Sequence, residues 1–210
     1  MSDYPIALAV EDYVPVALTA AGVALLRHRH PLVPAAAVLV VAGGFAKATW
    51  KLIVALDGPD VRWLHEALFP LLAFGFTLLL YALARELRRP PPPAALAVPL
   101  VAALAASAAL RDAWPAMVWT ILAVTGAAVL LLRAAARAGD RVAAALFGLW
   151  LAGQYVLGPM AARAEQSVSL QWAEQSCNTL AQAAFAYAAW RLTTATRARA
   201  AKRAAERAAA

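Results

Sequence analysis

The sequence predicts an all-helical integral membrane protein with seven transmembrane helices. Its 210 residues are 63% hydrophobic, and the mean hydropathy is +0.65. A water-soluble domain of this length needs more polar surface than such a composition supplies. Apolar stretches also recur along the chain, each near the roughly 20 residues with which a helix crosses a bilayer. Both observations place the function in or at a membrane.

The apolar stretches are bounded by charged or turn-forming residues. The first begins at Glu11 and lacks both a basic leader and a small-residue cleavage site, so we expect a retained helix and not a signal peptide. The fourth is short, is rich in alanine and follows the proline run 90–93, which forms a stiff connection. The chain then divides into a transmembrane domain, 1–192, and a basic cytoplasmic tail, 193–210. The predicted helices are residues 11–26, 32–56, 63–83, 94–110, 114–132, 142–162 and 168–192.

The lysines and arginines predict the orientation of the helices. If the seven spans are accepted, 14 of the 19 basic residues fall on one side of the membrane, and Arg62, Arg111 and Arg163 fall on the other. The positive-inside rule then puts the amino terminus outside and the carboxyl terminus in the cytoplasm, as expected for a multi-pass protein of the inner (plasma) membrane. The 14 residues are Arg27, Arg29, Arg85, Arg88, Arg89, Arg133, Arg137, Arg141, Arg191, Arg197, Arg199, Lys202, Arg203 and Arg207.

The net charge of +7 is therefore mainly an orientation signal. The basic tail has no accompanying aromatic or glycine pattern, so we expect no nucleic-acid partner. Attraction to anionic lipid headgroups accounts for such a tail. The lipid bilayer is the partner that the sequence predicts most directly.

Few residues of the chain suit catalysis or metal binding. Cys177 is the single cysteine, which excludes an intramolecular disulfide and a paired-cysteine metal or redox site. Of the three histidines, His28 and His30 belong to a basic turn, and His65 begins the third predicted helix. The sequence contains no nucleophile elbow, phosphate-binding loop or dinucleotide fingerprint. We expect no metal and no cofactor, and we assign no catalytic residue.

The last predicted helix has a polar stripe. At about 100° per residue, its five polar side chains fall within an arc of roughly 100° on an otherwise apolar helix. Polar groups in hydrocarbon are costly unless they are paired or line a cavity, so this face is predicted to point into the protein. The five residues are Gln171, Glu174, Gln175, Asn178 and Gln182.

Two lysines in the second predicted helix form the other part of a candidate site. Lys47 and Lys51 are four residues apart and share a helix face. Lysine within a span needs a partner or an escape to water. We expect Lys51 to reach water near the outer surface and Lys47 to be a buried counter-ion, with Glu174 as its preferred partner over Glu66.

Other polar residues lie at matching depth in the outer halves of the helices. They predict one outward-facing intramembrane cavity, whereas the inner halves of the same helices are almost entirely apolar. Interhelical hydrogen bonds that only hold the bundle together are the alternative interpretation. The predicted ligand-binding residues are Lys47, Trp50, Lys51, His65, Glu66, Gln154, Tyr155, Glu174, Gln175 and Asn178.

The two halves of the chain show a weak internal similarity. Residues 18–27 resemble residues 124–133, and at a slightly larger offset residues 63–83 align with 172–192. This predicts two parallel three-helix units joined by a fourth helix, an architecture that resembles the sugar-transporting seven-helix families. The chain departs from the known patterns, because it lacks a Pro-Gln dipeptide and has no lysine in the seventh helix for a retinal Schiff base.

Three functions fit these patterns. The leading hypothesis is a membrane binding protein or transporter for a small polar solute or a lipid headgroup, which uses the outward-facing cavity. The second is a noncatalytic membrane subunit or sensor, whose polar core only fixes helix packing and whose apolar surface meets a partner protein or another copy of the chain. The third is an intramembrane hydrolase in which Glu66 and Glu174 act as acid and base.

Overall fold

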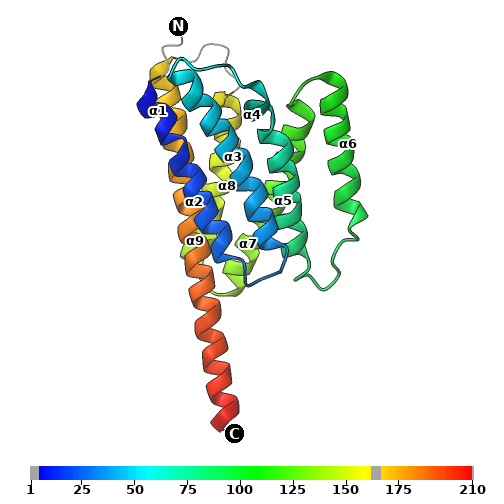
Figure 1. Ribbon diagram of the computed structural model, residues 1–210. Coiled ribbons are helices and arrows are strands. Elements are labelled where there is room, and N and C mark those ends of the chain that lie inside the picture. The colour runs from blue at the N-terminus through cyan, green and yellow to red at the C-terminus, as the bar shows by residue number, and fades with distance from the viewer. Residues whose placement is uncertain (1–4, 162–166, 210) are drawn as a thin grey trace.

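A computed structural model describes residues 5–161 and 167–209, and over these residues all regular structure is helical (Figure 1). The chain passes back and forth along one axis, so that most helices run side by side. The elements are α1 (Ile6–Glu11), α2 (Tyr13–Leu25), α3 (Val33–Ala55), α4 (Arg62–Glu66), α5 (Leu68–Ala84), α6 (Ala94–Leu110), α7 (Trp114–Arg137), α8 (Arg141–Ala161) and α9 (Val168–Ala209).

The described elements form seven long helices, as the sequence predicts. Only Asp12 separates α1 from α2, and only Ala67 separates α4 from α5. The first long helix begins at Ile6, earlier than the predicted residue 11, because the apolar run continues on both sides of Glu11 and Asp12. The sequence led us to expect Glu11 and Asp12 at the outer end of the first helix. Here Asp12 is inside the protein, with only 8% of its surface exposed.

Six of the long helices form a closed ring. Neighbouring contacts run in the order α2, α3, α5, α7, α8 and α9, and α9 returns to α2. Helix α6 lies outside the ring against α5 and α7, as its place at the edge of the bundle in Figure 1 shows. The long helix that α6 forms is therefore a peripheral connection between two groups of three.

Close packing holds neighbouring ring helices together. A Cβ atom added to Gly22 of α2 would lie 2.4 Å from Cε1 of Phe185 in α9. Small residues permit such close approach, which supplies van der Waals contact where lipid offers no hydrophobic driving force. Polar contacts add to it, since Tyr13 and Thr49 join α2 to α3 and the indole N–H of Trp119 donates to Thr77 across α7 and α5.

Among the residues that the structure describes, four helices are long and apolar enough to cross a membrane, judged by length and composition: Ile6–Leu25, Val33–Ala55, Arg62–Ala84 and Trp114–Arg137. Helix α6 and the described part of α8 up to Leu157 are apolar but shorter. Helix α9 is long, but its polar stripe and basic tail lower its hydropathy. The structure thus supports a helical bundle with several membrane-length apolar helices.

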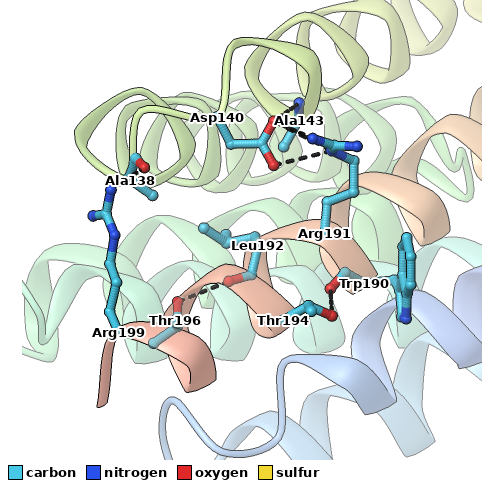
Figure 2. A network of polar contacts seen from close by, with 9 residues as sticks. All are labelled: Ala138, Asp140, Ala143, Trp190, Arg191, Leu192, Thr194, Thr196 and Arg199. Carbon is cyan, nitrogen blue, oxygen red and sulfur yellow. Dashed lines mark hydrogen bonds and ion pairs between the residues drawn. The ribbon is translucent and has the colours of Figure 1, made fainter. Parts of the chain in front are cut away.

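Helix α9 runs for 42 residues without a break at the predicted tail boundary and projects beyond the bundle (Figure 1). The turn between α7 and α8 braces it where it leaves the ring (Figure 2). Asp140 accepts the backbone N–H of Ala143 at the start of α8 and forms an ion pair of 3.0 Å with Arg191. About two turns further along, Arg199 donates to the carbonyl of Ala138. The described part of the tail therefore begins as a continuation of the helix.

The backbone N–H of Ala143 and the guanidinium of Arg191 hold the pKa of the Asp140 carboxyl below its usual value. Both groups interact with the charged form of the side chain, and such interactions favour ionisation. The carboxylate therefore stays charged where the turn meets α9.

Candidate functional site

A cavity of about 460 Å³ lies inside the ring. All six ring helices line it, each with residues at helical spacing, such as Val16 and Thr19 of α2, and Asp12 at the start of α2 lines it too. It occupies the half of the bundle that is nearer α1, α4 and the start of α9, which we call the polar half. The volume is within the range of small-molecule sites in proteins.

The polar stripe of α9 forms one wall of the cavity. Glu174, Gln175, Asn178 and Gln182 all line it. These four residues recur at intervals of one, three and four positions, so they share one face of the helix. The fifth residue of the stripe, Gln171, lies one turn earlier and is not part of the lining.

The two lysines of α3 both reach the cavity, but they differ in their partners. Lys51 forms an ion pair of 2.7 Å with Asp12 of α2, where the sequence led us to expect Lys51 in outer water. Lys47 has no carboxylate within ion-pair distance among the residues that the structure describes. Asp12, Lys51 and Glu174 line the same cavity as Lys47.

Two carboxamide groups in the cavity wall each have one atom without a hydrogen-bond partner among the described residues. Nε2 of Gln154 in α8 and Oε1 of Gln175 in α9 are buried, and neither has a partner in the described part of the chain. Gln175 as a whole is 6% exposed. A buried polar atom left without a partner costs about 1–3 kcal/mol. One free donor and one free acceptor therefore lie in the wall of the same cavity.

A layer of hydrogen-bonded and aromatic side chains lies between the cavity and the rest of the ring. Gln182 accepts the indole N–H of Trp150 at 3.2 Å and donates to Asn178 at 3.3 Å. The ring of Phe185 lies 4.4 Å from that of Trp150, and both residues are almost completely buried. Below this layer the ring is filled with apolar side chains.

We call the filled part of the bundle the apolar half. Its interior consists of residues that are at most 4% exposed, and they come from each of the six ring helices. They include Leu26, Val33, Leu79, Leu83, Leu131, Ala135, Phe147, Ala189 and Leu192.

Three of the predicted ligand-binding residues lie away from the cavity. Trp50 donates to Asp60 at 2.8 Å, and its ring lies 4.7 Å from that of His65. Glu66 is exposed on the short α4. The hydroxyl of Tyr155 is 2.8 Å from that of Thr125, and Tyr155 is 52% exposed. The other seven predicted residues line the cavity: Lys47, Lys51, His65, Gln154, Glu174, Gln175 and Asn178.

The sequence interpretation left Asp12 and Gln182 out of the site, although both line the cavity. For Gln182 the signal was present, because it belongs to the polar stripe of α9. For Asp12 the signal was its spacing from Thr19, which places both on one face of α2. Thr120 of α7 also lines the cavity, but the sequence carried no signal for it. Its hydroxyl donates to the carbonyl of Ala116 in its own helix.

Over the ranges that the structure describes, no three His, Cys, Asp or Glu side chains gather closely enough to hold a metal ion. The polar groups that line the cavity are two ammonium groups, two carboxylates, one imidazole, two hydroxyls and four amides. No protein-family model, curated protein sequence or solved structure matches this chain.

Proposed function

We propose that this chain is a seven-helix protein of the inner membrane that binds a small polar solute or a lipid headgroup in the cavity of its polar half. The observation that supports the proposal best is the pair of buried, unpartnered amide atoms of Gln154 and Gln175 in one cavity wall. Each such atom costs free energy when it has no partner, so a molecule bound in the cavity would stabilise both. A bound molecule supplies the missing acceptor and donor.

The proposed orientation has the amino terminus outside and the carboxyl terminus in the cytoplasm, so that the polar half faces outward. The basic residues of the α7–α8 turn and of the described part of the α9 tail lie at the opposite end of the bundle, in agreement with the positive-inside rule. Arg163, which the sequence assigns to the outer side, lies outside the described residues. A carboxyl-terminal reporter should be active only in the cytoplasm.

The arrangement of the ring supports a parallel repeat of two three-helix units, which remains part of the proposal. A shift of three places along the ring order would carry α2, α3 and α5 onto α7, α8 and α9. Helix α6 lies outside both groups. Close contacts recur at related places, since Gly43 of α3 packs on Leu71 of α5 and Gly153 of α8 packs on Ala181 of α9.

Binding is favoured over transport because the apolar half is filled. A transporter needs a second path from the cavity to the cytoplasm, and no polar side chain of the described interior leads from Gln182 through the layer of Trp150 and Phe185. Uptake by proteoliposomes of a solute that the protein binds would show that this layer opens.

The second candidate is a noncatalytic membrane subunit or sensor. The ion pair between Lys51 and Asp12 and the bond between Trp150 and Gln182 are contacts that such a structural core would contain. Co-purification of one partner protein in equal amount, with no response to any solute, would favour this candidate.

Binding can be tested on the purified protein in nanodiscs by thermal unfolding with a panel of small polar solutes. A solute at about 100 times its Kd adds about 2.7 kcal/mol to the free energy of unfolding. We expect at least one solute to raise the unfolding midpoint of the wild type, and Gln175→Leu to abolish that rise. Glu86→Gln, far from the cavity in an ion pair with Arg29, is the matched control. If no solute raises the midpoint, the proposal fails.

A further inference from the structure

Of the two lysines and two carboxylates that line the cavity, only one lysine and one carboxylate are in direct contact. Lys51 and Asp12 are in direct contact at 2.7 Å. Lys47 and Glu174 also line the cavity, but the two are not within ion-pair distance of each other. One positive and one negative group therefore face the same space with room between them.

A ligand with a single charge suits this arrangement poorly. An anion at Lys47 would meet the carboxylate of Glu174, and a cation at Glu174 would meet the ammonium of Lys47. In a cavity of low dielectric, such unbalanced charges are costly. Two amides add a donor and an acceptor, because Nε2 of Gln154 and Oε1 of Gln175 are buried and have no hydrogen-bond partner among the described residues.

The remaining wall of the cavity is apolar. Helix α5 contributes Leu68, Phe69, Leu72 and Phe76, and α7 contributes residues such as Ile121. A bound molecule can place an apolar body against this wall while its charged groups face α3 and α9. Lining of this kind, mostly apolar with a few polar groups that fix the orientation, is typical of small-molecule sites.

From these observations we infer that the cavity binds a zwitterion with an apolar body, whose anionic group lies at Lys47 and whose ammonium lies at Glu174. This inference rests on the proposed binding function. Two sources share this chemistry: a free amino acid and the phosphoethanolamine headgroup of a lipid.

Three solutes of nearly equal shape separate the charge requirement from the apolar fit. Leucine has both charges, 4-methylpentanoate lacks the ammonium, and 3-methylbutylamine lacks the carboxylate. Binding to the protein in nanodiscs of phosphatidylglycerol, a lipid without an ammonium group, is measured by calorimetry. We expect leucine, or a short-chain phosphatidylethanolamine for a headgroup site, to bind roughly 10- to 100-fold more tightly than either singly charged solute, because each of these loses one charged hydrogen bond. The preferred zwitterion identifies the source.

Variants assign the two charges. Lys47→Met should bring the affinity for the zwitterion down to that for 3-methylbutylamine, and Glu174→Gln should bring it down to that for 4-methylpentanoate. Glu86→Gln should bind as the wild type does. The comparison of solutes on the wild type does not depend on whether a variant folds.

The outcomes also separate this inference from the function on which it rests. If a neutral or singly charged solute binds the wild type as tightly as both zwitterions, and Gln175→Leu abolishes its binding, the zwitterion inference is wrong and the binding function stands. If neither zwitterion nor any solute of the wider panel binds, both are wrong.

Discussion

The two halves of the bundle are built from the same six ring helices but differ in what fills the space between them. In the polar half, side chains such as Lys47, Glu174 and Gln175 surround a cavity, and two buried amide atoms lack partners. In the apolar half, residues such as Leu79 and Leu131 are completely buried in close contact. The filled apolar half therefore supplies stability, whereas the polar half is less stable because its interior is open and polar.

The largest expected effect distinguishes two phenylalanines. Phe185 is fully buried against Trp150 and Phe147, whereas Phe76 borders the cavity. We expect Phe185→Ala to lower the free energy of unfolding by about 3–5 kcal/mol, the usual cost of removing a buried aromatic side chain. Phe76→Ala should cost about half as much, because it enlarges a space that already exists. Chemical unfolding in micelles measures both, and equal losses would contradict the difference between the halves.

The next largest effect on the free energy of unfolding concerns the ion pair between Asp12 and Lys51 in the polar half. Asp12→Asn leaves the ammonium of Lys51 without its paired carboxylate in a mostly buried place. Breaking such a pair by removing one partner costs about 3 kcal/mol, whereas replacing both partners is often nearly neutral. We therefore expect Asp12→Asn to destabilise the protein and Lys51→Met, added to it, to recover most of the loss. A double mutant as unstable as the single one would show that the two side chains do not act as a pair.

Two glutamines of α9 sharpen the comparison within the cavity wall itself. Gln175→Leu removes a buried oxygen without a partner, so we expect the free energy of unfolding to stay equal or to rise by about 1 kcal/mol. Gln182→Leu removes the acceptor of Trp150 and the donor to Asn178, so it should cost about 1–2 kcal/mol. Unfolding of the ligand-free protein checks both. Destabilisation by Gln175→Leu to the same extent would mean that the amide of Gln175 serves packing.

The smallest effect concerns pH at the far end of the apolar half. The pKa of Asp140 is lower in the folded protein than its usual value of 3.8 because of the Ala143 N–H and Arg191. The folded state thus binds fewer protons than the unfolded state, and the resulting stabilisation is present above about pH 4 and is lost as the pH falls through the lower, folded pKa. Asp140→Asn should remove this part of the acid dependence. Unfolding midpoints between pH 7 and pH 3 test it, and an unchanged pH profile in the variant would contradict it.

Much of the architecture could be predicted from the sequence because membrane-length apolar runs leave few alternatives. The seven long helices follow from hydropathy, and the face of α9 that lines the cavity follows from the spacing of Glu174, Gln175 and Asn178. The partner of Lys51 could not be predicted in the same way, because the closeness of Asp12 depends on α2 and α3 being neighbours in the ring. The exclusion of Tyr155 from the cavity also depends on rotation of α8 about its own axis, which the weak polarity of that helix does not determine.

We propose that the cavity of the polar half opens to the outer side and that the apolar half is sealed. Single cysteines in a Cys177→Ala background test it most directly: Asn178→Cys in the cavity wall and Ala189→Cys in the filled half. Oriented vesicles are treated with a membrane-impermeant maleimide. We expect Asn178→Cys to react from the outer side only and Ala189→Cys to react from neither side. Reaction of Ala189→Cys as fast as Asn178→Cys, or no reaction of Asn178→Cys from the outer side, would contradict it.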